Sequence, residues 1–300
     1  MIIEALISKR DQLPLELAII EPEGEAIGII QLIHGMSEHK ERYYDFMDYL
    51  SQKGYICAIH DHRGHGASVK DTSHLGYFYT NDITYIVDDA YLVTEYLKNR
   101  YPTLNISIFS HSMGTLVSRN YLKKYEKHIE KIVLCGPPTE NKLVDVALFA
   151  GRLTGSFYDE YKPNKILNKL SVGYYNKGYK NQNEWICSNL ETVSSYNTDP
   201  LCGFTFTTSG FMNLFQLLKS AFIKKDWIPQ NSSLPIFLIA GVDDPVIQGK
   251  EKFNELEEFL KEVGYENIKS KLYKGKRHEL LNKIDKEIVY KDVLDFFYTD

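Results

Sequence analysis

The sequence predicts an α/β protein in which a mostly parallel central sheet is flanked by helices. Short apolar runs alternate with segments that have the apolar spacing of helices, which is the pattern of strands joined by crossover helices. This alternation stops near residue 137 and resumes near residue 231. A chain of 300 residues, 43% of them hydrophobic, can also bury a large core.

The strands are predicted from short runs rich in isoleucine, leucine and valine. Two early runs precede a third that is apolar almost throughout and ends at His34-Gly35, which is typical of a buried strand. Five later runs have a similar character. Strands are expected at residues 2–7, 15–20, 27–33, 55–59, 106–109, 131–134, 234–241 and 268–273.

The helices are predicted from apolar residues three and four positions apart. Helices are expected at residues 42–53, 83–97, 113–125, 250–263 and 285–298. Residues 1–136 and 231–300 are therefore expected to form the α/β core. Residues 137–230 are expected to form a mainly helical cap inserted into that core, the alternative being an ordinary second domain.

The composition argues against several classes of protein. The 40 acidic residues outnumber the 35 basic residues, and this net charge of -5 disfavours a nucleic-acid partner. The four cysteines form no C-x-x-C pair, so no metal site, redox motif or cofactor is expected. The chain shows no secretory leader and no apolar stretch that could span a membrane, which predicts a cytoplasmic protein.

A candidate nucleophile, Ser112, lies where the strand at residues 106–109 passes into the helix at 113–125. A nucleophile elbow needs this context, with small residues two positions on either side of the serine. Gly114 occupies the downstream position, whereas Ser110 replaces the usual upstream glycine. The pentapeptide alone fits a serine that caps an ordinary helix equally well.

Two later loops could supply the groups that a serine nucleophile needs. Such a serine requires a histidine base that is oriented by a carboxylate. Asp243 and Asp244 follow the strand at residues 234–241, and His278 follows the strand at residues 268–273. Both loops therefore come at the carboxyl end of a strand, as Ser112 does.

The same arrangement needs two backbone N–H donors for a developing oxyanion. One comes from the residue after the nucleophile and the other from the loop after the third strand. These are Met113 and Met36, respectively.

Five motifs occur in a fixed order between residues 34 and 279. They are His34 to Tyr43 for H-G-x-x-E-H-x-x-R-Y, Asp61 to Ser68 for D-x-R-G-H-G-x-S, Ser110 to Gly114 for the elbow, Gly241 to Val246, and Arg277 to Glu279. In this order they resemble the monoacylglycerol lipase and lysophospholipase branch of the α/β-hydrolases, which is grouped with the serine aminopeptidases. The resemblance implies the α/β-hydrolase fold, a Ser112-His278-Asp244 triad and a lid that includes Pro200 to Phe204.

Rival chemistries fit the sequence less well. His60, His62 and His65 superficially match a metallo-hydrolase signature, but that signature needs a carboxylate where Gly64 stands. Relatives with an aspartate nucleophile are excluded by Ser112. Acyl transfer remains an alternative fate of an acyl-enzyme, and a non-catalytic binding protein on the same scaffold is an alternative of another class.

The cap is expected to choose the substrate. It holds 15 aromatic residues among 94, and four of them, Phe204, Phe206, Phe211 and Phe215, are candidate substrate contacts or, alternatively, core of the cap. The leading hypothesis is a small lipid-like substrate, a long-chain monoacylglycerol or lysophospholipid. Short-chain esters and aminoacyl amides are the alternatives. A lipid substrate would be compatible with transient contact at a membrane surface, and the sequence indicates no oligomeric state.

Overall fold

A computed structural model of the chain describes residues 1–155, 159–282 and 285–299. The strands are β1 (Ile2–Ile7), β2 (Pro14–Ile20), β3 (Gly28–Ile33), β4 (Tyr55–His60), β5 (Ile106–His111), β6 (Ile132–Cys135), β7 (Ile236–Gly241) and β8 (Ile268–Tyr273). The helices are α1 (Tyr44–Ser51), α2 (Thr84–Arg100), α3 (Met113–Tyr125), α4 (Val144–Gly155), α5 (Lys165–Leu170), α6 (Leu190–Thr198), α7 (Thr208–Ala221), α8 (Lys250–Glu262) and α9 (Glu287–Tyr298).

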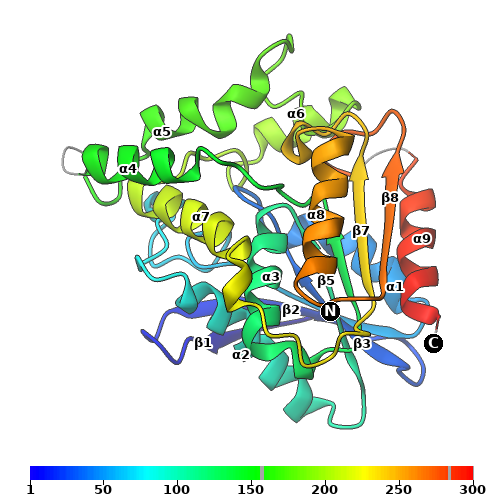
Figure 1. Cartoon of the computed structure of the whole chain (residues 1–300). Coiled ribbons are helices and arrows are strands. Elements are labelled where there is room, and N and C mark those ends of the chain that lie inside the picture. Colours follow the sequence, from blue (N-terminus) through cyan, green and yellow to red (C-terminus); the bar gives the residue numbers. More distant parts are fainter. Residues whose placement is uncertain (156–158, 283–284, 300) are drawn as a thin grey trace.

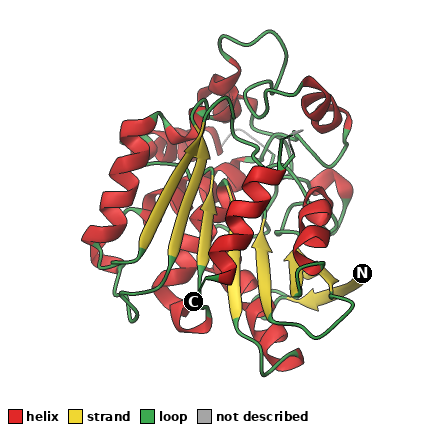
Figure 2. Ribbon diagram, turned by 90° about the vertical axis from the view of Figure 1, so that its right-hand side faces the viewer, coloured by secondary structure: helices red, strands yellow, loops and turns green. Residues whose placement is uncertain are grey.

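The strands form one sheet with the order β1-β2-β4-β3-β5-β6-β7-β8 (Figures 1 and 2). β2 pairs antiparallel with both β1 and β4, and every other neighbouring pair is parallel. The predicted mostly parallel sheet is therefore confirmed. Each predicted strand and helix of the core is present within a few residues, except that the helix expected from residue 42 starts as a 3₁₀ turn, Lys40–Tyr43.

Helices cover both faces of the sheet because successive strand residues point to opposite sides. On β3, Ile29 and Ile33 pack in the layer that contains α2, α3 and α8. Ile30 and Leu32 pack in the opposite layer, with α1 and α9. Burial on both faces explains why the central strands are mostly apolar rather than alternating.

Residues 137–230, called the cap segment below, contain α4 to α7. α4, α5 and α6 lie above the carboxyl ends of the parallel strands, and α7 lies lower, beside α3 (Figure 1). The last helix of the cap segment, α7, packs against both α4 and α3. Phe206, Phe211 and Leu217 are fully buried in the same apolar layer as α2 and α3. The end of the cap segment is therefore continuous with the main core.

Polar contacts fix both ends of α7. The helix starts where the Thr207 hydroxyl accepts the N–H of Gly210 at 3.2 Å. At its other end, α3 supplies Asn120, which donates to the carbonyl of Leu217 at 3.1 Å, and Lys123, which donates to the carbonyl of Ser220 at 2.5 Å. A cation at the carboxyl end of a helix also complements the helix dipole.

Within the residues that the structure describes, no helix is both long enough and apolar enough to cross a membrane.

The burial of Phe211 predicts the effect of removing it. Phe211→Ala should lower the free energy of unfolding by about 3–5 kcal/mol, because it removes a large ring and leaves a cavity between α7 and the sheet. Phe149→Ala on α4 is the matched control, since that ring is 61% exposed and its loss should change stability by less than about 0.5 kcal/mol. Urea unfolding of both variants measures the difference, and equal losses would contradict the shared core.

Candidate active site

Ser112 sits in a strained turn between β5 and α3. Its backbone angles are φ 52° and ψ -120°, which are costly for a residue with a side chain. The Ser112 N–H donates to the carbonyl of Cys135 at 2.9 Å, which holds the turn against β6. This is the geometry of a nucleophile elbow, in which the hydroxyl projects above the sheet.

Different contacts explain why small residues occur two positions before and two positions after Ser112. A Cβ on Gly114 would lie 2.2 Å from the carbonyl oxygen of Ile33, so no larger residue fits between α3 and β3. Ser110, which replaces the usual first glycine, is fully buried, and its hydroxyl donates to the carbonyl of Val133 at 3.1 Å. The hydrogen bond to β6 explains how this side chain is accommodated inside the sheet.

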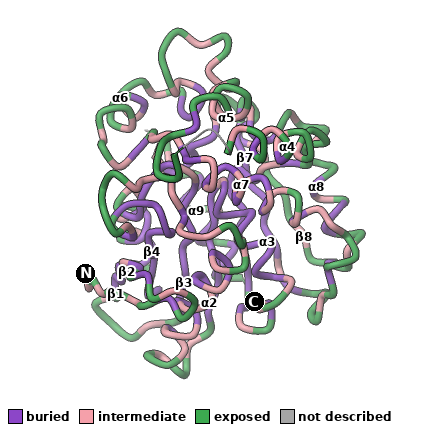
Figure 3. Tube along the Cα trace, turned by 90° about the vertical axis from the view of Figure 1, so that its left-hand side faces the viewer, coloured by how far each residue is buried: buried purple, intermediate pink, exposed green. Residues whose placement is uncertain are grey.

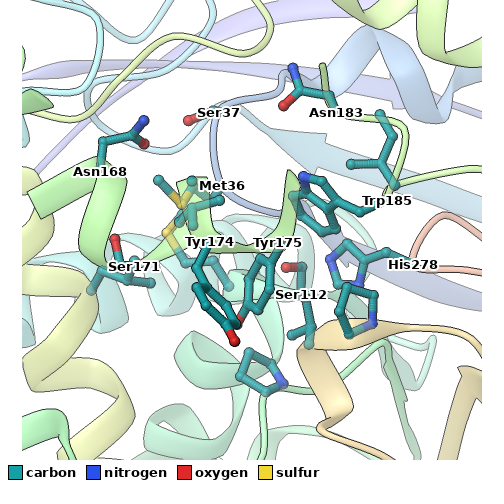
Figure 4. Close-up of a pocket in the computed structure, with 18 of the residues that line it drawn as sticks. Met36, Ser37, Ser112, Asn168, Ser171, Tyr174, Tyr175, Asn183, Trp185 and His278 are labelled. Carbon is teal, nitrogen blue, oxygen red and sulfur yellow. The ribbon is translucent and has the colours of Figure 1, made fainter. Parts of the chain in front are cut away.

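His278 and Asp244 form a buried pair beside Ser112. The Nδ1 atom of His278 lies 2.9 Å from Oδ2 of Asp244, whose other oxygen accepts the N–H of Val246 at 2.9 Å. Asp244 is buried, whereas the rival Asp243 is exposed and does not contact His278. Figure 4 shows His278 and Ser112 side by side at the same pocket. In this arrangement Asp244 can fix the tautomer of His278 that leaves Nε2 free to accept a proton.

Rings on two sides restrict the space around the His278 imidazole. The ring of His111 lies 4.7 Å from it, and the ring of Trp185 from the cap segment lies 5.3 Å from it. Trp185 and its neighbours are tied to the same loop, since the Glu279 N–H donates to the carbonyl of Ile186 at 2.7 Å. The cap segment therefore limits the access of water to the candidate base.

Met36 and Met113 line the same pocket as Ser112. In the described part of the chain, the N–H of neither residue donates to a protein acceptor. The Met36 loop is held on both sides, since Gly35 donates its N–H to Glu38 Oε1 at 2.5 Å and Ser37 donates its N–H to His65 Nε2 at 3.2 Å. These two main-chain donors match the positions expected for an oxyanion hole.

The histidine-rich loop after β4 supports the Met36 loop. His34 Nε2 accepts the N–H of His62 at 2.9 Å, and the His62 Nε2–H donates to the carbonyl of His34 at 3.1 Å. His65 also contacts the Met36 loop, because its Nε2 atom accepts the N–H of Ser37. This loop is therefore a scaffold, and its neutral imidazoles act as both donors and acceptors.

Convergent metal-ligating atoms occur elsewhere in the described residues. The single group of three or more consists of His39, Asp199 and Cys202, and His60, His62 and His65 form no such group. His39 Nε2 and Asp199 Oδ2 are 2.8 Å apart, which joins the loop after β3 to the cap segment.

Sequence reasoning missed a buried charged network that starts beside the elbow. His111 Nδ1 lies 3.1 Å from Glu38 Oε1, and His111 Nε2 lies 3.3 Å from the carbonyl oxygen of His278. Both neighbours can only accept, so both ring nitrogens of His111 must donate and the ring is an imidazolium. Arg42 extends the network by donating to both carboxylate oxygens of Glu279 at 2.7 Å.

The ionisation of this network follows from its geometry. Burial opposes the charge of Glu38, but the hydrogen bond and charge of His111, with Arg42, outweigh it and lower the Glu38 pKa to about 2. Burial likewise opposes the charge of His111, and its hydrogen bond to Glu38 raises the His111 pKa above its ordinary value. Each member of the pair therefore favours the charged form of the other.

A cavity of about 850 Å³ opens beside Ser112 and His278. One part of its wall is apolar and comes from α3, α4 and α7, including Leu116, Ala147 and Leu218. Another part is polar and aromatic and comes from residues 168–185 (Figure 4). The site therefore offers one environment for an apolar chain and another for a polar group.

The four predicted phenylalanines divide between the pocket and the core. Phe204 and Phe215 line the cavity. Phe206 and Phe211 do not; both are fully buried, and the Phe206 ring packs on Phe78 and His65. Sequence reasoning missed Tyr174, Tyr175 and Trp185, which line the polar wall, and their only signal was the aromatic enrichment of the cap segment.

Residues 24–285 match the family described as serine aminopeptidase, S33. The chain belongs to this S33 family. A monoacylglycerol lipase of Mycolicibacterium smegmatis is 25% identical over 278 residues, covering 91% of this chain and 88% of the relative. The human monoglyceride lipase is 24% identical and covers 87% and 78%, respectively.

The fold of this S33 member matches solved structures over its full length. A thermostable carboxyl esterase from Bacillus coagulans superposes with a TM-score of 0.90 at 24% identity, covering 98% of this chain and 97% of the esterase. The α/β-hydrolase fold implied by the sequence motifs is confirmed.

Glu38→Gln tests the charged network. The substitution removes the charge that stabilises the His111 imidazolium, so His111 should titrate at lower pH and the elbow should lose its alignment with the Met36 loop. We expect the rate at which a fluorophosphonate labels Ser112 to fall by about tenfold or more. Glu41→Gln, at an exposed position three residues further along the chain, is the control and should leave the rate unchanged. An unchanged rate in Glu38→Gln would contradict the positioning role.

The buried histidines predict a loss of stability in acid. Burial, with the charges of neighbouring residues, lowers the pKa of His60 to about 4 and of His62 and His65 to about 3, against about 6.5 when unfolded. The unfolded chain therefore binds more protons between these values. This part of the stability is complete above about pH 6.5 and falls as pH decreases toward 3.

Urea unfolding at pH values from about 7.5 to 5 measures this slope. Neither ring nitrogen of His60 has a hydrogen-bond partner in the described residues, so His60→Leu removes one titrating group without breaking a bond. The variant should unfold with a shallower pH dependence than the wild type. An identical slope in the variant and the wild type would rule out a contribution of His60 to the pH dependence of stability.

Proposed function

We propose that this protein hydrolyses carboxylic esters through an acyl-enzyme formed on Ser112. His278 accepts the Ser112 hydroxyl proton as the oxygen attacks the ester carbonyl, and Asp244 stabilises the resulting imidazolium. His278 then returns the proton to the leaving alcohol. A water molecule, activated by His278, resolves the acyl-enzyme, releases the acid and regenerates Ser112. The observation that carries the proposal is Ser112 in its strained turn, beside a histidine paired with a buried carboxylate.

The N–H groups of Met36 and Met113 would stabilise the tetrahedral oxyanion. Main-chain donors that are already oriented cost no reorganisation during the reaction, and each contributes about 2.7–4 kcal/mol in comparable sites. The Met36 loop is fixed by Glu38 and His65, so the donor is in place before substrate binds.

The pocket supports a long-chain monoacyl ester as the substrate, either a monoacylglycerol or a lysophospholipid. Its volume lies within the range of about 300–1,000 Å³ that is usual for ligand sites. The apolar wall formed by α3, α4 and α7 suits an acyl chain, and the polar wall at residues 168–185 suits a hydroxylated head group. In this proposal the cap segment is the lid, and it sets the choice of substrate.

An aminoacyl amide receives less support from the pocket. Recognition of a free α-amino group needs an available carboxylate near the scissile bond. Among the described lining residues, the carboxylates are Glu38 and Glu279, and both already pair with cations. None of the cap carboxylates Asp159, Glu160, Glu184 and Glu191 lines the cavity.

Substitution of the triad tests the mechanism. Ser112→Ala and His278→Ala should each reduce turnover of a p-nitrophenyl ester by roughly a millionfold, and Asp244→Asn should cost less. Circular dichroism of each variant checks that it is folded. Absence of fluorophosphonate labelling at Ser112 in the wild type would instead favour a non-catalytic binding protein.

The apolar wall of the cavity predicts how activity depends on the length of the acyl chain. Across p-nitrophenyl esters of increasing acyl length, kcat/KM should rise toward long chains, because each added methylene gains about 0.8 kcal/mol when fully buried. Leu218→Glu in the apolar wall should remove this preference while leaving acetate hydrolysis measurable. A sharp optimum at the shortest chains, or faster cleavage of an aminoacyl anilide, would identify a short-chain esterase or an amidase.

A further inference from the structure

Three side chains with metal-binding atoms meet where the cap segment contacts the loop after β3. His39 comes from that loop, and Asp199 and Cys202 come from the turn after α6. The ligand atoms of the three residues all lie within 4.8 Å of one another. In the part of the chain that the structure describes, this is the single group of histidine, cysteine or carboxylate side chains that converges in this way. The group is therefore a candidate metal site.

The three types of ligand favour zinc. A thiolate, an imidazole nitrogen and a carboxylate oxygen are the ligands that Zn²⁺ takes in proteins, whereas Mg²⁺ and Ca²⁺ prefer oxygen ligands alone. Three protein ligands leave one position of a tetrahedral site for water. The set therefore fits a Zn²⁺ ion that keeps one bound water.

The distances require only small movements. In tetrahedral zinc sites the ligand atoms are about 3.4–3.6 Å apart. His39 Nε2 and Asp199 Oδ2 are 2.8 Å apart in a hydrogen bond, so a zinc ion would separate them by about 0.6 Å. Because the three ligand atoms already lie within 4.8 Å of one another, the Cys202 sulfur would approach by about 1.2 Å or less. On binding, the Cys202 thiol releases its proton to water, and neutral His39 keeps its one ring proton on Nδ1.

Hydrogen bonds hold the two chain segments against each other. Gly203 donates its N–H to the carbonyl of Ser37 at 2.9 Å, and the Ser37 hydroxyl donates to the carbonyl of Phe204 at 2.7 Å. The Asp199 carboxylate also accepts the N–H of Leu201 at 2.8 Å. The ligands from the cap segment therefore face the ligand from the core without a metal ion.

Solvent reaches the group from one side. His39 and Cys202 are buried, whereas the Asp199 side chain is 30% exposed. Figure 3 shows that α6, which ends directly before Asp199, is mostly exposed. None of the three ligands lines the cavity beside Ser112. An ion can therefore enter from the surface without passing through the candidate active site.

The charges around the group can accept a divalent cation. The Arg42 guanidinium lies 3.9 Å from the Cys202 sulfur, and it pairs with Glu279 and Glu38. With Asp199, the neighbourhood holds three carboxylates against two cations, which are Arg42 and the imidazolium paired with Glu38. Zn²⁺ and the Cys202 thiolate together add one positive charge. The occupied site would therefore be electrically neutral, which avoids the cost of an unpaired buried charge.

We propose that His39, Asp199 and Cys202 form a zinc-binding site that ties the cap segment to the loop after β3. The site is separate from the triad, and the proposal does not depend on the proposed hydrolase function. Because the ligands come from both sides of the contact, zinc stabilises the folded chain over the unfolded one. The cysteine pattern alone could not reveal this site, since His39 and Asp199 are 160 positions apart.

Metal binding tests the proposal without using enzyme activity. In isothermal titration calorimetry of the full chain we expect one Zn²⁺ per chain, with a dissociation constant of about 1 μM or tighter, and no binding of Mg²⁺. Zinc should also raise the melting temperature by about 2 °C or more. Co²⁺ bound in place of zinc should give thiolate-to-metal charge-transfer absorption. Absence of Zn²⁺ binding, or several weakly bound ions per chain, would overturn the proposal.

Substitution of single ligands locates the metal. Cys202→Ser and Asp199→Asn keep the size of each side chain. Each should weaken zinc binding by at least the tenfold or so that loss of a supporting residue costs in zinc sites, and Cys202→Ser should abolish the charge-transfer absorption of Co²⁺. Cys187→Ser is the matched control, because Cys187 is another buried cysteine of the cap segment, and it should bind zinc as the wild type does. Circular dichroism checks that each variant is folded.

The remaining outcomes are distinguishable. If Cys202→Ser binds zinc as tightly as the wild type, or if Cys187→Ser loses binding instead, the metal lies elsewhere and the proposal is wrong. Loss of binding in His278→Ala with full binding in Cys202→Ser would place the metal at the triad, which also overturns it. If the wild type binds zinc through Cys202 but cleaves no ester, the proposed function fails and the zinc site stands.

Discussion

The carboxylate of Glu38 joins the loops on which the candidate chemistry depends. It accepts the N–H of Gly35 next to the Met36 donor, and it pairs with His111 next to Ser112. Through His111 it also reaches the carbonyl of His278. A buried carboxylate is costly unless its charge and lone pairs are satisfied, and here an imidazolium, a guanidinium and the Tyr43 hydroxyl satisfy them. The Met36 loop, the Ser112 turn and the His278 loop are therefore linked, directly or through His111, to one buried carboxylate.

The sequence predicted the parts of the site that follow from local chain geometry. Ser112, His278 and the acid loop could be placed because each follows a strand of the parallel sheet, and the carboxyl ends of such strands meet at one edge. The choice between Asp243 and Asp244 came from the family resemblance, since both side chains have the same chemistry. Only the fold shows that one carboxylate turns inward to His278 while the other stays exposed.

The pocket could not be predicted in the same way. Phe204, Phe206, Phe211 and Phe215 look alike in sequence, because apolar spacing reports burial and does not distinguish a core from a cavity wall. Tyr174, Tyr175 and Trp185 come from turns without periodicity, and the network around Glu38 depends on residues far apart in the chain. Long-range packing decides these contacts, so local patterns carry little information about them.

The position of α7 has a consequence for how this enzyme could diversify. One side of the helix lines the cavity through Leu214, Phe215 and Leu218, and another side belongs to the apolar layer around α3. A mutation in α7 that changes the apolar wall of the cavity therefore also disturbs the packing on which folding depends. By contrast, α4 and residues 168–185 line the same cavity with less burial. Mutations that change the substrate range should therefore accumulate in these segments first. Similar mutations in α7 should be tolerated only when other residues make the fold more stable.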